Sequence, residues 1–73
     1  MRKILFAERL KELRKEENLT QLELAKSTGL SQSAITAWEV GTNSPTATAI
    51  VLLAEYFDVT TDYILGVSDF KKI

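Results

Sequence analysis

The stretch "GLSQSAITAWEVG", residues 29–41, decides how this chain folds, because its apolar and polar residues separate with the period of a helix. At about 100° per residue, a helix over Ser31–Val40 divides into two sides. The apolar side carries Ala34, Ile35 and Trp38. The opposite side carries Gln32, Ser33, Thr36 and, at its edge, Ala37. We expect the apolar side to face the core. The opposite side carries too little charge for an ordinary solvated face, and its small residues would let it approach another surface closely.

Apolar spacing predicts four more short helices and no strand, so we expect an all-α fold, a compact five-helix bundle. The other helices are expected over about Leu5–Glu17, from Thr20 to about Ser27, over about Pro45–Phe57, and over a short segment containing Tyr63, Ile64 and Leu65. Residues 1–66 would form one domain, and residues 67–73 a C-terminal tail.

Several helix ends carry recognisable stop and start signals. Asn18 can adopt the left-handed conformation that ends a first helix. "TQLE", Thr20–Glu23, reads as a capping box that opens the second helix, whose inward residues we expect to be Leu22 and Ala25. Gly29 can supply the positive φ of a sharp turn, after which Ser31 caps the third helix.

The later helix ends are marked in the same way. Gly41 should end the third helix, and "NSP" places Ser44 as N-cap and Pro45 at the first helical position of the fourth. The fourth helix is apolar over most of its circumference, so we expect it to be central. Its apolar residues are Ala49, Ile50, Leu52, Leu53, Ala54 and Phe57. Asp58-Val59 connects it to the fifth helix, which Thr60 or Thr61 caps and Gly66 closes.

Composition excludes several classes of protein. The 73-residue chain has no cysteine and no histidine, which excludes disulfides, thiolate metal sites and imidazole chemistry. No apolar run approaches the ~20 residues of a membrane span, and the N-terminus has no signal-peptide pattern. We expect a cytoplasmic protein without metal, cofactor, membrane partner or evident small-molecule ligand.

The net charge of −1 hides an uneven distribution. The Lys and Arg residues lie in residues 1–26 and 71–72, whereas residues 27–70 carry only acidic charges. A basic footprint for a polyanion would therefore come from the two ends of the chain, with Arg2 and Lys3 as candidate phosphate contacts.

The second and third helices are separated by a few residues around Gly29, which is the spacing of a helix-turn-helix. The neutral face of the third helix suits the major groove of DNA. The planar amide of Gln32 can make a bidentate contact to adenine, and the methyl groups of Thr36 and Ala37 suit the thymine methyl. Together with Ser33, these residues are the candidate base-reading set.

The segment "LTQLELAKSTGLSQSAITAWEVGTNSP" resembles the lambda-repressor/Cro-like (Xre-type) helix-turn-helix DNA-binding family. The resemblance covers roughly residues 5–66, including the similar tail "LAEYFDVTTDYILG". The matching positions are Thr20-Gln21, Leu24-Ala25, Gly29-Leu30-Ser31, Ile35, Trp38-Glu39, Gly41 and Pro45. It implies a transcriptional regulator, most simply a repressor, that reads a palindromic DNA operator as a homodimer.

The resemblance also implies individual roles. Gln21 would bind a DNA phosphate and support Gln32, and Ser31 would contact the DNA backbone or a base edge. Arg14 would form a structural ion pair with Glu39. Family members often carry Lys or Arg after the E-x-G element, but Thr42, Asn43 and Ser44 are neutral here. We expect these three to contact phosphate through hydroxyl and amide groups, helped by the free amides at the start of the fourth helix.

Tyr63, Val67 and Phe70 follow the i, i+4, i+7 spacing near the end of the chain. They could complete the core or form a dimer surface, and "VSDFKKI" could instead begin a linker to another domain. The sequence shows no nucleophile–base pair, metal constellation or phosphate loop, so we do not expect an enzyme. The alternative function is a helix-turn-helix-derived protein-interaction module with weak or no DNA binding, which would suit the acidic second half.

Overall fold

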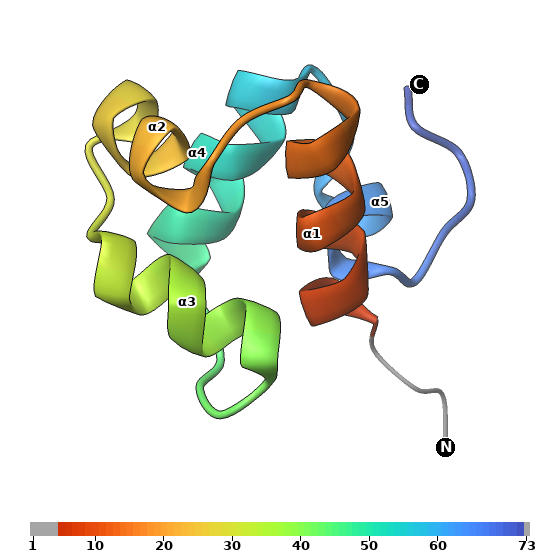
Figure 1. The fold of residues 1–73 in the computed structure, drawn as a ribbon. Coiled ribbons are helices and arrows are strands. Elements are labelled where there is room, and N and C mark those ends of the chain that lie inside the picture. Colours follow the sequence, from red (N-terminus) through yellow and green to blue (C-terminus); the bar gives the residue numbers. More distant parts are fainter. Residues whose placement is uncertain (1–4, 73) are drawn as a thin grey trace.

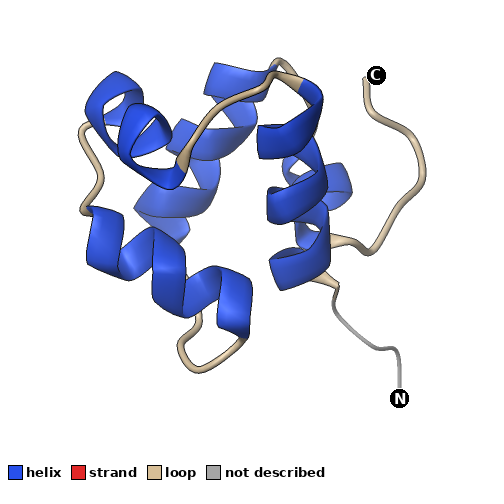
Figure 2. Ribbon diagram, viewed as in Figure 1, coloured by secondary structure: helices blue, strands red, loops and turns tan. Residues whose placement is uncertain are grey.

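The computed structural model describes residues 5–72 and confirms an all-helical fold. Its helices are α1 (Phe6–Glu16), α2 (Gln21–Thr28), α3 (Gln32–Val40), α4 (Ala47–Phe57) and α5 (Thr61–Leu65) (Figure 1). Residues 5–72 contain no strand (Figure 2). Within that range, no helix combines the length and apolar character needed to cross a membrane.

Each helix contributes one fully buried aliphatic side chain to a shared core. These side chains are Leu10, Leu24, Ile35, Leu53 and Ile64. Trp38 of α3 meets Phe6 of α1 edge to face, with ring centroids 6.2 Å apart. Since such aromatic pairs fix a packing geometry as well as burying area, the two rings hold α3 against α1.

The turn signals around α2 act as predicted, but one inward residue is wrong. Thr20 and Glu23 form the reciprocal capping box, and Asn18 has a φ of 57°. Leu22 is 46% exposed, whereas Leu24 is fully buried beside Ala25. Two helical positions correspond to about 200° of rotation, so Leu22 and Leu24 cannot both face the core.

The start of α4 also differs from the prediction. The N-cap is Thr46, whose hydroxyl accepts a hydrogen bond from the Ala49 amide at 3.1 Å, and the helix begins at Ala47. Ser44 and Pro45 therefore precede the helix. Pro45 and Ile50 line the same hollow and occupy the N′ and N4 positions, at which a hydrophobic staple forms.

Helix α4 is not buried all round, contrary to its apolar sequence. Ala49, Leu53 and Ala54 are buried, but Val51, Leu52 and Tyr56 are 37–46% exposed. The helices that pack most closely against α4 are α5 and α2, and the buried residues of α4 lie on one side only.

The predicted helical stripe of Tyr63, Val67 and Phe70 does not form. Helix α5 ends at Leu65, and Gly66 has a φ of 80°. Tyr63 is buried, with the Arg9 guanidinium 3.9 Å from its ring centroid, while Phe70 is 78% exposed. The helix stops before Val67, so these three residues do not share a face.

Residues 67–72 fold back beside α1 and α5 (Figure 1). The Thr60 amide donates to the Lys71 carbonyl at 2.7 Å, and Arg9 donates to the Ser68 carbonyl at 3.3 Å. These bonds tie the segment to the bundle.

Candidate nucleic-acid interface

The corner between α2 and α3 presents α3 at the surface. Gly29 ends α2 in the left-handed conformation with a φ of 78°, and the Ser31 hydroxyl caps α3 by accepting from the Ala34 amide. Leu24 and Ile35 are fully buried between the two helices and the core. The inner side of α3 is therefore fixed, and its outer side lies free in the described chain (Figure 1).

The residues predicted to read bases lie on that outer side. Gln32, Ser33 and Thr36 are exposed, and Ala37 is half-buried at the edge. The face carries hydroxyl, amide and methyl groups and no formal charge. A rigid neutral face of this kind can approach base edges closely and offer hydrogen bonds to them.

Val40 extends this face and was not among the contact residues predicted from the sequence. It is 70% exposed and lies one helical turn after Thr36. The available signal in the sequence was its i+4 spacing from Thr36, which places both residues on one side of a helix. Its apolar side chain adds a surface that suits a thymine methyl group.

The expected ion pair between α1 and α3 is present and bidentate. Arg14 donates from Nε to Glu39 Oε2 at 2.7 Å and from Nη2 to Glu39 Oε1 at 2.8 Å. The Arg14 and Glu39 side chains are only 13% and 3% exposed. Arg14 also donates from Nη1 to the Leu19 carbonyl at 2.8 Å. This one guanidinium thus connects α1, the turn before α2, and α3.

The pair stays ionised at neutral pH. Burial by itself raises the pKa of Glu39. Hydrogen bonds from Arg14 and Gln21, together with the positive charges of Arg14 and Lys11, lower it more strongly. The pKa of Glu39 therefore lies below its ordinary value. The hydrogen bond to Glu39 raises the pKa of Arg14 further above its ordinary value, although burial opposes it.

Gln21 contacts partners other than the one expected. Its Nε2 donates to Glu39 Oε1 at 3.1 Å, and its Oε1 accepts from the Thr36 hydroxyl at 2.6 Å. In the free protein these two bonds direct the Gln21 amide toward Glu39 and Thr36, and its support of Gln32 stays a prediction. The physical reason for this direction is the buried carboxylate of Glu39, which attracts the amide donor inward.

The predicted phosphate-contact residues frame the same face. Ser31 lies at the start of α3, and Thr42, Asn43 and Ser44 lie exposed after it. The Thr42 hydroxyl donates to the Ala37 carbonyl at 3.3 Å, which holds this loop against the end of α3. Arg2 and Lys3 lie outside the described residues.

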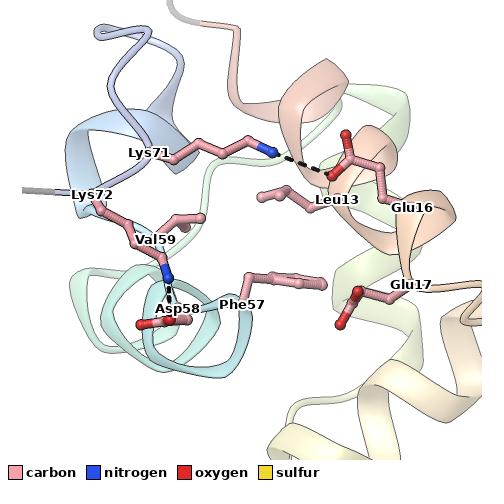
Figure 3. A pocket seen from close by; sticks show the side chains of 8 residues that line it. All are labelled: Leu13, Glu16, Glu17, Phe57, Asp58, Val59, Lys71 and Lys72. Carbon is pink, nitrogen blue, oxygen red and sulfur yellow. Dashed lines mark ion pairs between the residues drawn. The ribbon is translucent and has the colours of Figure 1, made fainter.

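A second surface feature lies on the other side of α1 from α3. A hollow of about 210 Å³ forms where the C-terminal segment meets the ends of α1 and α4 (Figure 3). Lys71 pairs with Glu16 at 3.7 Å and Lys72 with Asp58 at 2.7 Å on its rim. All four side chains are more than half exposed, so these pairs contribute little to stability. Residues 5–72 contain no group of side chains suited to a metal ion.

Comparison with known proteins finds the same fold in DNA-binding regulators. A family model described as "Helix-turn-helix" matches residues 10–64. The HTH-type transcriptional regulator YobD of Bacillus subtilis is 37% identical over 65 residues, covering 89% of this chain and 58% of its own length. The HTH-type transcriptional activator BcrR of Enterococcus faecalis is 38% identical over 61 residues, which are 84% of this chain and 30% of BcrR. The chain thus spans less than two thirds of either relative.

A solved structure shows this fold together with DNA. The P22 c2 repressor protein in complex with a synthetic operator superposes with a TM-score of 0.81 at 29% identity, covering 90% of this chain and all of that one.

Proposed function

This chain belongs to the lambda-repressor-like helix-turn-helix family, and from that membership we propose that it is a sequence-specific regulator of transcription that binds double-stranded DNA. In this proposal α3 enters the major groove. Gln32 pairs with an adenine edge, while Ser33, Thr36, Ala37 and the added Val40 contact neighbouring base edges and methyl groups.

One observation carries the proposal: the outer face of α3 is exposed, neutral and rigidly held. Solvated helix faces usually mix charged with polar side chains, whereas this one presents Gln32, Ser33 and Thr36 and no formal charge. The Arg14–Glu39 pair and the Phe6–Trp38 contact fix the helix that carries them. A face held this firmly meets bases in one register, as specific recognition requires.

The surrounding polar groups would bind the phosphates. Ser31 accepts a bond from the Ala34 amide and keeps its own proton for a phosphate oxygen. Gln21 keeps the second proton of its amide for the same purpose. Thr42, Asn43 and Ser44 would contact the backbone beyond the end of α3, and Arg2 and Lys3 would add positive charge.

We further propose a homodimer on a palindromic operator, acting as a repressor. The bundle measures 31 × 25 × 21 Å, so two adjacent copies can place their α3 helices about one turn of DNA, ~34 Å, apart. Tyr63 and Phe70 were both candidates for the dimer surface. Phe70 is exposed and remains a candidate for the dimer contact, whereas Tyr63 is buried in the core. Repression needs only that the bound protein occupies a promoter. Because the proposed partner is a DNA operator, we also expect the protein to act in the cytoplasm.

Selection from random duplex DNA at two salt concentrations tests the proposal. We expect enrichment of one short palindromic sequence, bound more weakly at higher salt. Val51→Ala on the exposed side of α4 is the control and should enrich the same sequence. A protein-interaction module would enrich no sequence and show no salt-dependent binding to DNA, and that result would contradict the proposal.

A further inference from the structure

A chain of hydrogen bonds runs from the buried ion pair to the outer face of α3. Glu39 Oε1 accepts from Arg14 Nη2 at 2.8 Å and from Gln21 Nε2 at 3.1 Å. An ionised carboxylate can only accept hydrogen bonds. The side-chain amide of Gln21 must therefore turn its NH₂ group toward Glu39 and its oxygen away from it.

The orientation of Gln21 determines which way Thr36 can bond. The Thr36 hydroxyl donates its proton to Gln21 Oε1 at 2.6 Å. A hydroxyl has one proton and two lone pairs, so Thr36 has only acceptor capacity left for any further partner. Thr36 is exposed on the outer face of α3, where such a partner can reach it.

We propose that Thr36 selects an amino-bearing base, adenine or cytosine, and that Gln21 is the positioning residue that sets this preference. The inference rests on the proposed function, since it requires α3 in the major groove. There, adenine N6 and cytosine N4 are hydrogen-bond donors, whereas guanine and thymine present acceptor oxygens. A base oxygen facing the Thr36 lone pairs cannot form a hydrogen bond with the hydroxyl, whose proton is already donated to Gln21, and that base oxygen is left unsatisfied.

The methyl group of Thr36 would favour a different base from its hydroxyl, so the selected base distinguishes methyl contact from hydrogen bonding. Contact with a thymine methyl needs no hydroxyl and would favour thymine. The hydroxyl can only accept a hydrogen bond, so it favours adenine or cytosine at the position that it faces.

Four proteins test the assignment by selection from random duplex DNA: the parent, Thr36→Val, Thr36→Ser and Gln21→Met. Valine keeps the shape and removes the hydroxyl, serine keeps the hydroxyl and removes the methyl, and methionine keeps the length of Gln21 but removes its amide. Thermal melts establish that each variant is folded.

We expect the parent to prefer adenine or cytosine over guanine and thymine by about tenfold at one position of the half-site. Thr36→Ser should keep this preference and Thr36→Val should abolish it. Gln21→Met should bring guanine and thymine to within about twofold, because the released hydroxyl can then donate or accept. Preferences at other positions should stay unchanged.

Three results would overturn the assignment while the proposed function stands. The first is a guanine or thymine preference that Thr36→Val removes. The second is a selected site in which Thr36→Val changes no position. The third is an affinity loss in Gln21→Met that is uniform across sequences, which would make Gln21 a phosphate contact alone. If the parent enriches no sequence, the proposed function itself fails, and the assignment with it.

Discussion

At the scale of single residues, Glu39 is a buried charge whose partners are all hydrogen-bond donors. Its pKa is lowered in the folded state, so its contribution to stability is present above the ordinary glutamate pKa, about 4.3, and is lost as pH falls through the folded pKa. Removing one partner of a buried pair costs about 3–5 kcal/mol, because the other charge is left uncompensated.

We predict that Glu39→Gln lowers the free energy of unfolding by about 3 kcal/mol at pH 7, and that this difference from the parent narrows as the pH falls below about 4. Urea denaturation at several pH values measures it. The variant lacks the titrating group at every pH, whereas the parent loses its contribution only in acid. A difference that stays constant from pH 7 to pH 3 would show that Glu39 is not ionised in the native pair.

Gln32 carries a separate prediction, because it is exposed and outside the bonds around Glu39. Gln32→Ala should relax the base preference at one position by about 1–3 kcal/mol and leave the melting temperature unchanged. Binding to a panel of single-base operator variants measures the preference. If all four bases rank as they do for the parent, Gln32 does not read a base.

At the scale of helices, α3 is oriented by its buried side. Trp38 is 6% exposed and packs against Phe6, so Trp38→Ala should lower the free energy of unfolding by about 3–5 kcal/mol. Val40→Ala on the exposed side of the same helix is the control, and should change it by less than about 0.5 kcal/mol. Equal melting temperatures for the two variants would show that α3 faces the other way.

The helix ends offer a matched pair of glycines. Gly29 and Gly66 both have a φ near 80°, which strains any residue with a Cβ by about 1–2 kcal/mol. A Cβ at Gly66 would also lie 2.8 Å from the Leu5 backbone nitrogen, whereas one at Gly29 meets nothing within 4 Å.

We therefore predict that Gly66→Ala destabilises the protein more than Gly29→Ala does, by more than about 1 kcal/mol in the free energy of unfolding. Chemical denaturation of the two variants side by side measures the difference. Equal losses would show that the chain before α1 moves away from α5 at little cost.

At the scale of the whole molecule, positive charge is unevenly placed relative to α3. The C-terminal segment, which carries Lys71 and Lys72, lies on the other side of α1 from α3 (Figure 1). Arg14 is committed to Glu39, and Arg9 donates to the Tyr63 and Ser68 carbonyls. These four cations are therefore not placed to neutralise phosphates beside α3.

We predict a shallow salt dependence of DNA binding, with a slope of log K against log salt no steeper than about −4. Lys72→Ala should leave that slope unchanged. Titrations of the selected operator at four salt concentrations measure both. A slope that falls by about one in Lys72→Ala would place DNA against the C-terminal segment and not against α3.

Much of the fold follows from local sequence signals. The capping box at Thr20–Glu23, the cap at Ser31 and the glycines at 29, 41 and 66 act within one or two turns of chain, so they are readable without tertiary structure. The same holds for the division of α3 into two sides, because helical period alone sets it. The Arg14–Glu39 pair was expected only from the family resemblance, since these residues are far apart in sequence.

Tertiary structure decided the features that depend on what packs where. Leu22 and Leu52 are as apolar as their buried neighbours, and only the positions of the other helices leave them exposed. Gln21 turns toward Glu39 because burial strengthens the attraction of an ionised carboxylate for a donor, and no spacing rule encodes that choice. The sequence by itself thus determined the number of helices and the exposed face of α3, because periods and caps are local. The packed bundle decided how the polar groups behind that face are oriented, because hydrogen-bond direction depends on neighbours brought together from three helices.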